Sequence, residues 1–114
     1  MQYYCISELI FVFQIESHIE RICVILSHNI RAVRHMASRC LSVWADIMPQ
    51  KVMPIIAKQV VPRLDAGEND VTRQGAIEAI WCIVDRLGLN LLPYIVLLVV
   101  PVLGKSGFHF MCQY

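Results

Sequence analysis

The sequence predicts an all-α fold, an α-solenoid of stacked helical hairpins with about two full hairpins and partial ones at both ends. Three observations predict it. The chain of 114 residues is 57% hydrophobic and 17% charged, which excludes intrinsic disorder. Its apolar residues recur at helical spacing, and a shift of 39 residues superposes its two central blocks.

Prolines at matched positions are the clearest sign of the internal repeat. Under the 39-residue shift Pro54 falls on Pro93, and the Val-Val-Pro tripeptide at 60–62 falls on a second Val-Val-Pro at 99–101. The same register also aligns Arg34 with Arg73, Ala37 with Ala76, Asp46 with Asp85 and Leu64 with Leu103. Chance rarely aligns two prolines and a tripeptide, so the chain contains two copies of one structural unit.

Each unit is expected to be a pair of helices, over about 30–48 and 51–64 in the first unit and about 70–87 and 91–103 in the second. The opening helix of each unit has apolar residues at the spacing of one helical face. They are Ile30, Val33, Ala37, Leu41, Trp44 and Met48 in the first unit, and Val71, Ala76, Ile80, Ile83 and Leu87 in the second.

A second apolar stripe, Ile77, Trp81 and Val84, runs along helix 70–87. A helix that is apolar on two sides is typical of the inner layer of a repeat array, where it packs between neighbouring units. Trp81 is therefore expected to be a packing residue, as is Trp44.

Prolines delimit the second helix of each unit. Pro54 and Pro93 are expected in the first turn, where the missing N–H costs little, and Pro62 and Pro101 are expected to bend or end the helix near its last turn. Residues 95–102 are rich in β-branched side chains, but Pro101 and the matching copy in the first unit argue against a strand.

The two ends of the chain diverge from the repeat. Residues 1–29 are expected to form a divergent partial repeat or cap, with helical spacing over about 11–26, and residues 105–114 a divergent tail. The helix at 91–103 then lacks the helix that would pair with it in the next unit. This exposed apolar surface predicts that the isolated chain self-associates.

A period of 39 residues with paired helices and a Val-Arg and Ala signature resembles the HEAT repeat. The signature residues are Val33, Arg34, Ala37 and Pro54 in the first unit, and Val71, Arg73, Ala76 and Pro93 in the second. The strings AVRHMASRC (32–40), QGAIEAI (74–80) and LLPYIVLLVVPVLG (91–104) are similar to the HEAT-repeat region of the TATA-binding-protein-associated factors, a family of SWI/SNF-like ATPases.

The resemblance implies a non-catalytic scaffold from a nuclear transcription regulator. By this resemblance the partner is TATA-binding protein, which the full-length parent removes from DNA using ATP, and DNA is touched only indirectly or weakly. The chain has no G-x-x-x-x-G-K-[ST] phosphate loop, so it is expected to be a fragment without the ATPase, with no cofactor of its own.

The turn before helix 70–87 is acidic, with Asp65, Glu68 and Asp70. One interpretation is a solvated helix cap, since Asn69 or Asp70 can accept from the first backbone N–H groups of the helix. The other is a contact with a basic surface of TATA-binding protein, because recognition often lies on the loops of a rigid scaffold.

The block at 31–64 is basic and contains Arg31, Arg34, His35, Arg39, Lys51, Lys58 and Arg63. A DNA contact through phosphates is one interpretation. The other, favoured by the matched positions of Arg34 and Arg73, is that these arginines pair with turn carboxylates or carbonyls in adjacent units. The net charge of +1 excludes a wholly electrostatic nucleic-acid binder.

No catalytic, cofactor-binding or metal-ligating constellation is expected. The histidines (His18, His28, His35 and His109) and the cysteines (Cys5, Cys23, Cys40, Cys82 and Cys112) are scattered without ligand spacing. The five thiols are interpreted mostly as buried and free. Two alternatives stay open: a HEAT adaptor of the importin type, and a small membrane protein using residues 89–103, although fifteen residues fall short of the length that a helix needs to cross a bilayer.

Overall fold

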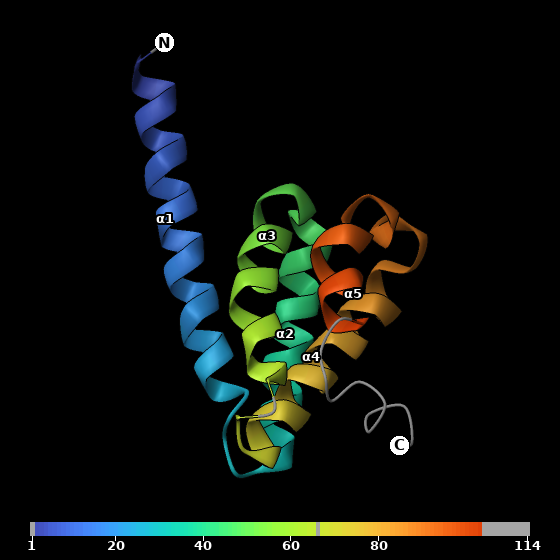
Figure 1. The fold of residues 1–114 in the computed structure, drawn as a ribbon. Helices are drawn as coiled ribbons and strands as arrows, with labels where there is room; N and C mark the ends of the chain where they lie inside the picture. Colours follow the sequence, from blue (N-terminus) through green and yellow to red (C-terminus); the bar gives the residue numbers. More distant parts are fainter. Residues whose placement is uncertain (1, 66, 104–114) are drawn as a thin grey trace.

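A computed structural model describes residues 2–65 and 67–103, and these form helices joined by short turns, with no strand, which confirms the all-α class. The expected tail at 105–114 lies outside the described residues. In chain order the elements are α1 (Gln2–Ile25), α2 (Arg31–Ile47), α3 (Pro49–Val60), the 3-10 helix η1 (Val61–Leu64), α4 (Asp70–Leu87), the 3-10 helix η2 (Gly88–Tyr94) and α5 (Ile95–Leu103) (Figure 1).

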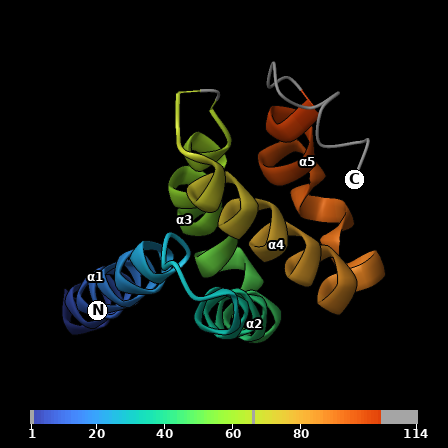
Figure 2. The same cartoon turned by 90° about the horizontal axis from the view of Figure 1, so that it is seen from below.

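The helices are arranged in two layers. α2 and α4 pack side by side as the most extensive pair, and α3 lies in the other layer between α1 and α5 (Figures 1 and 2). Because α4 packs on α2 and α5 packs on α3, the α4–α5 pair repeats the arrangement of the α2–α3 pair. The N-terminal part of α1 projects beyond the body formed by the other helices (Figure 1).

One core joins the two layers. It contains fully buried side chains from each α-helix, among them Ile19, Leu41, Ile56, Ile83 and Leu98. Burying an aliphatic side chain of this size stabilises a fold by about 1.5–3 kcal/mol relative to leaving it exposed. The apolar faces expected from helical spacing thus supply the packing that holds the layers together.

α1 is a single helix of 24 residues, longer than the partial repeat expected over about 11–26. The first 25 residues contain no proline or glycine. With no residue that breaks the backbone hydrogen-bond pattern, the helix continues back to Gln2.

The prediction for Pro54 is wrong by one turn. α3 begins at Pro49, so Pro54 lies inside the helix rather than in its first turn. Proline suits the first helical position because its φ is already helical and its missing N–H has no partner there. The backbone tightens from α to 3-10 at Val61, next to Pro62.

The second unit starts its outer helix later than expected. α5 begins at Ile95, and Pro93 lies in the preceding 3-10 segment η2. Gly88 stands where the first unit has Pro49, and it adopts φ 53, a conformation that glycine reaches without strain. The helix-starting proline of the first unit is thus replaced by a glycine that ends α4, and α5 begins seven residues after it.

Gly75 allows α4 to approach the turn between α1 and α2. A Cβ at this position would lie 1.9 Å from the carbonyl oxygen of Leu26. No side chain fits in that space, so only glycine permits this contact. The contact fixes where α4 crosses the end of α1, and therefore where the acidic turn before α4 lies.

Candidate interaction surface

The acidic turn is a surface feature that joins η1 to α4. Asp65, Glu68 and Asp70 are all exposed. The turn is closed by its backbone, since the N–H of Asp65 donates to the Pro62 carbonyl at 3.2 Å and that of Glu68 donates to the Asp65 carbonyl at 3.0 Å. Three exposed carboxylates therefore lie within six consecutive residues, in the segment that joins η1 to α4.

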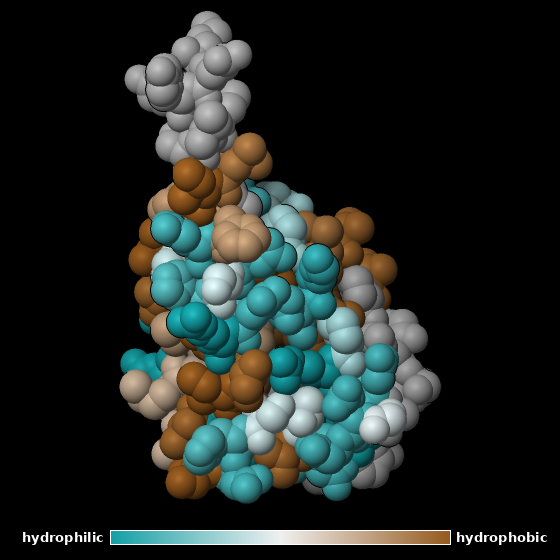
Figure 3. Space-filling model, turned by 90° about the vertical axis from the view of Figure 1, so that its left-hand side faces the viewer, coloured by the Kyte–Doolittle hydropathy of each residue, from teal (hydrophilic) through white to brown (hydrophobic). Residues whose placement is uncertain are grey.

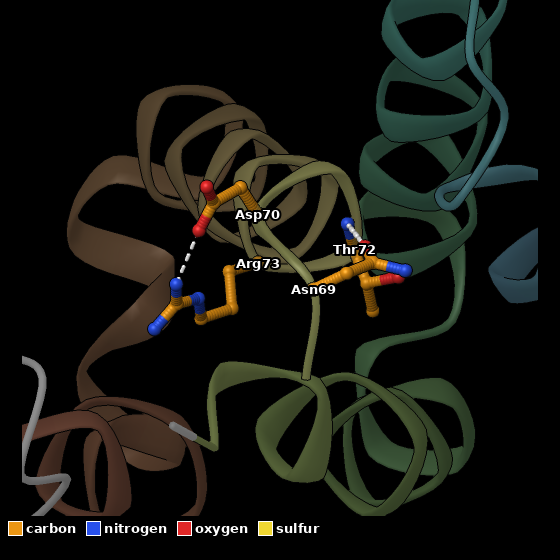
Figure 4. Close-up of polar contacts among 4 residues, drawn as sticks. All are labelled: Asn69, Asp70, Thr72 and Arg73. Carbon is orange, nitrogen blue, oxygen red and sulfur yellow. Dashed lines mark hydrogen bonds and ion pairs between the residues drawn. The ribbon is translucent and has the colours of Figure 1, made fainter. Parts of the chain in front are cut away.

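Asn69 provides the N-cap of α4. Its Oδ1 accepts a hydrogen bond from the Thr72 N–H at 2.8 Å, and its backbone is extended, as a cap requires (Figure 4). Asp70 is the first residue of the helix and forms an ion pair with Arg73 (Figure 4). The Asp70 side chain is 81% exposed, so this pair contributes little to stability.

Arg34 and Arg73 occupy matched positions but have different surroundings. Arg34 is 6% exposed, and its Nη1 donates to the carbonyls of His28 at 2.8 Å and Asn29 at 3.1 Å. Arg73 binds Asp70 in the first turn of its own helix. Arg34 therefore binds carbonyls of the turn that precedes its unit, as the repeat suggested, whereas Arg73 binds a carboxylate of its own helix.

The other signature residues divide by exposure. Ala37 and Ala76 are buried, Val33 and Val71 are half-buried, and Pro54 and Pro93 are exposed. The pattern is the same in both units. The alanines allow close helix packing, and the prolines lie at the surface of the outer layer.

A polar network behind the acidic turn has no pattern in the sequence. The Ser27 Oγ accepts from Arg63 Nη1 at 3.0 Å and from Thr72 Oγ1 at 3.1 Å. The network ties η1 and α4 to the turn after α1. Single serines and threonines carry no spacing signal, so only the assembled fold reveals it.

Most of the basic block is engaged inside the chain. His35 Nδ1 lies 2.5 Å from Glu78 Oε1, and Lys58 Nζ lies 3.9 Å from Glu16 Oε1. Lys51 Nζ lies over the Phe11 ring, 5.1 Å from its centroid. Arg34 and Arg63 also donate hydrogen bonds within the chain.

The second apolar stripe lies on the surface. Trp81 is 63% exposed, with Ile77 and Val84 at 37% and 39%, so the expectation that Trp81 packs is wrong. Trp44 is half-buried against the core, as expected. Further apolar side chains are exposed on α1, including Leu9 and Phe13, and Figure 3 shows apolar groups gathered near its N-terminal end.

The described residues contain no group of three or more side chains suited to a metal. Burial raises the pKa of the Cys23 thiol to about 11, and burial together with the nearby Glu78 and Asp85 carboxylates raises that of Cys82. Neither thiol is activated as a nucleophile. Cys40 is exposed rather than buried, while His109 lies outside the described residues.

A cavity of about 430 Å³ lies between the α2–α3 turn and η2. Its lining is largely apolar, with Leu89 and Leu92, and the Asp46 carboxylate is its one acidic group. General acid–base catalysis by a carboxylate pair needs a second acid close by. The cavity therefore carries no recognisable catalytic arrangement.

One stretch, Asp70–Leu98, is long and apolar enough to cross a membrane by length and composition alone. Only 22% of its most apolar window is buried. The stretch is not a single straight helix, because it turns at Gly88 and continues as the 3-10 segment η2. Helices of soluble proteins can meet the same two criteria.

The chain is similar to one segment of several much longer proteins. It is 43% identical over 90 residues to TATA-binding protein-associated factor 172 of Homo sapiens, covering 79% of this chain and 5% of that protein. It is 37% identical over 96 residues to TATA-binding protein-associated factor mot1 of Schizosaccharomyces pombe, covering 82% and 5%. It is 42% identical over 81 residues to TATA-binding protein-associated factor BTAF1 of Arabidopsis thaliana, covering 71% and 4%. No family model and no solved structure matches the chain.

Proposed function

This chain belongs to the family of TATA-binding protein-associated factors, matching one short segment of its members, and we propose that it is a non-catalytic helical scaffold that binds TATA-binding protein in the nucleus. In a full-length member the scaffold would hold TATA-binding protein while an ATPase region elsewhere in the polypeptide removes it from DNA. The chain itself would use neither ATP nor another cofactor.

The two-layer arrangement supports a HEAT-type solenoid as the form of this scaffold. The pairs α2–α3 and α4–α5 follow each other in the same order, with α4 on α2 and α5 on α3. The 39-residue internal repeat aligns the same two pairs. Stacked hairpins of this kind form a rigid support on which loops are held at fixed positions.

The exposed acidic turn is the feature that best supports TATA-binding protein as the partner. Its carboxylates lie at the end of a helix whose N-cap is formed by Asn69, so the cap does not depend on them. A turn with three acidic residues on a rigid scaffold is suited to a basic protein surface. We assign Asp65, Glu68 and Asp70 as the contacts with TATA-binding protein.

Reversing the charge of the turn tests this assignment. The triple substitution Asp65→Lys, Glu68→Lys and Asp70→Lys is expected to weaken binding of TATA-binding protein at least about tenfold, or about 1.4 kcal/mol. It is also expected to reduce the dependence of the affinity on salt. Titration by isothermal calorimetry at two salt concentrations measures both effects, in this chain and in a full-length member.

The matched control is a charge reversal away from the turn. Glu20 is an exposed carboxylate on α1, so Glu20→Lys is compared with the single variant Glu68→Lys. Only Glu68→Lys is expected to reduce the affinity. Unchanged binding by the triple variant would exclude the turn as the contact.

The exposed apolar side chains predict self-association of the isolated chain. Val96 on α5 and Phe13 on α1 are 75% and 74% exposed, and other large apolar residues accompany them on both helices. Apolar surface of this extent favours contact between molecules. Light scattering at increasing concentration is expected to show a rising mass, and a monodisperse monomer at every concentration would contradict this.

A further inference from the structure

A second cavity, of about 360 Å³, lies beside the acidic turn. Three segments form its walls: the turn after α1 with Ser27, the end of α3 and η1 with Lys58 and Arg63, and the start of α4 with Thr72. The turn after α1 and the acidic turn lie at the same end of the molecule (Figure 1). Helices of this chain lie on both sides of the cavity, so the cavity is not an open end of the repeat array.

Two positively charged side chains line this cavity, Lys58 and Arg63. Under the 39-residue shift they align with Leu97 and Val102, which are apolar. The repeat fold therefore does not need a charge at either position. Charged residues that depart from the pattern of the fold and face a cavity are candidates for binding.

The Arg63 guanidinium has hydrogen-bonding capacity left. Its Nη1 donates to Ser27 Oγ at 3.0 Å, while its Nε is buried and has no hydrogen-bond partner among the described residues. A buried donor without an acceptor is unfavourable. An oxyanion that reached the guanidinium would supply the acceptor, and charge-assisted hydrogen bonds of this kind are strong.

Lys58 is accessible from the solvent. Its side chain is 74% exposed, and its Nζ lies 3.9 Å from Glu16 Oε1. This is a long contact for an ion pair at an exposed position, so it holds the ammonium group only weakly. The Lys58 side chain can therefore turn toward an anion in the cavity.

A carboxylate borders the cavity as well, that of Glu68 in the acidic turn. Positive charges in the cavity and negative charges in the turn are therefore adjacent. A nucleic-acid backbone is a poor match, because the carboxylates of the turn would repel its row of phosphates. A protein segment in which an acidic and a basic side chain are neighbours matches both signs of charge.

We propose that the η1 cavity, defined as Ser27, Lys58, Arg63, Glu68 and Thr72, binds a carboxylate side chain of a partner protein. The carboxylate pairs with Lys58 and Arg63, and a basic side chain next to it in the partner faces the acidic turn. For the identity of the partner, this inference rests on the proposed function, in which the acidic turn contacts TATA-binding protein.

Lys58→Glu tests the η1 cavity with TATA-binding protein itself. The substitution is expected to weaken binding at least about fivefold, measured by isothermal calorimetry. Lys51→Glu is the matched control, because Lys51 is also an exposed lysine of α3 and lies outside the η1 cavity. Arg63 is left in place, since its hydrogen bond to Ser27 also supports the fold.

The outcomes separate the two proposals. Binding that Lys58→Glu leaves unchanged would overturn the η1 cavity as a contact. Absence of binding by the wild-type chain would instead remove the proposed function, and the cavity is then tested with peptides.

Two short peptides test the cavity without TATA-binding protein. Acetyl-Gly-Lys-Glu-Lys-Gly-amide carries both signs of charge, and acetyl-Gly-Lys-Gln-Lys-Gly-amide lacks only the carboxylate. A ligand of the folded chain raises the midpoint of urea denaturation, which circular dichroism follows. The glutamate peptide is expected to bind at least about fivefold more tightly than the glutamine peptide. Lys58→Glu should abolish this difference and Lys51→Glu should preserve it.

Equal binding of the two peptides to the wild-type chain would overturn the proposal. A preference for the glutamate peptide that Lys58→Glu leaves unchanged would do the same, because the carboxylate would then bind elsewhere. Inorganic phosphate is the last probe. If phosphate raises the midpoint of the wild-type chain but not of the Lys58→Glu chain, and the glutamate peptide has no effect, the cavity takes a free anion and the proposal is wrong.

Discussion

Replacing Gly75 with alanine is expected to lower the free energy of unfolding by about 2 kcal/mol, the typical cost of overpacking. The new Cβ would lie 1.9 Å from the Leu26 carbonyl oxygen, a backbone atom that cannot move aside as a flexible side chain would. The strain outweighs the gain of about 1 kcal/mol that alanine brings over glycine inside a helix. α4 must shift away from the α1–α2 turn, and the packing of α4 on α2 shifts with it.

Urea denaturation followed by tryptophan fluorescence measures this loss. Gly67→Ala is the control, because a Cβ at Gly67 meets no atom within 4 Å and its φ is not positive. It is expected to change the stability by less than about 0.5 kcal/mol, as most surface substitutions do. Equal stability of the Gly75→Ala and wild-type chains would show that α4 does not approach the turn this closely.

Replacing Arg34 with alanine is expected to cost about 2–3 kcal/mol, as for hydrogen bonds made by a charged group. The substitution removes the donor for the carbonyls of His28 and Asn29. It also removes a side chain that is almost fully buried, and so leaves a void beside the α1–α2 turn. Chemical denaturation measures the change.

The matched variant is Arg73→Ala at the equivalent position of the second unit. Arg73 pairs with a carboxylate that is 81% exposed, and exposed pairs contribute about 0–1 kcal/mol. Two arginines of one repeat signature are therefore expected to differ severalfold in their effect on stability. Equal losses of stability for the two variants would contradict this expectation, because the half-exposed Arg73 would then stabilise the chain as much as the buried Arg34.

Local sequence patterns predicted the helical class and the approximate ranges of the helices. Apolar spacing marked the buried face of α2, including Leu41, and the Asn69–Asp70 pair marked the start of α4. These signals are local, because a helix is defined by hydrogen bonds within one segment and its cap by the next three residues.

The structure differs from the sequence pattern where neighbouring segments decide the outcome. The repeat places Pro54 in a first turn, but Pro49 begins α3 earlier. The helical spacing of Trp81 suggests packing, but the side chain is exposed. Spacing tells which residues share a face of a helix and does not tell whether another helix covers that face.

The helical class, the 39-residue repeat and the relationship to the TATA-binding protein-associated factors can all be read from the amino-acid sequence. Which of two equivalent residues is buried depends on how the helices pack. Arg34 is covered while Arg73 is half-exposed, and Ser42 is covered while Trp81 is exposed. The physical reason is that helix formation depends on residues within a few positions, whereas burial depends on the helix that packs against them from elsewhere in the chain.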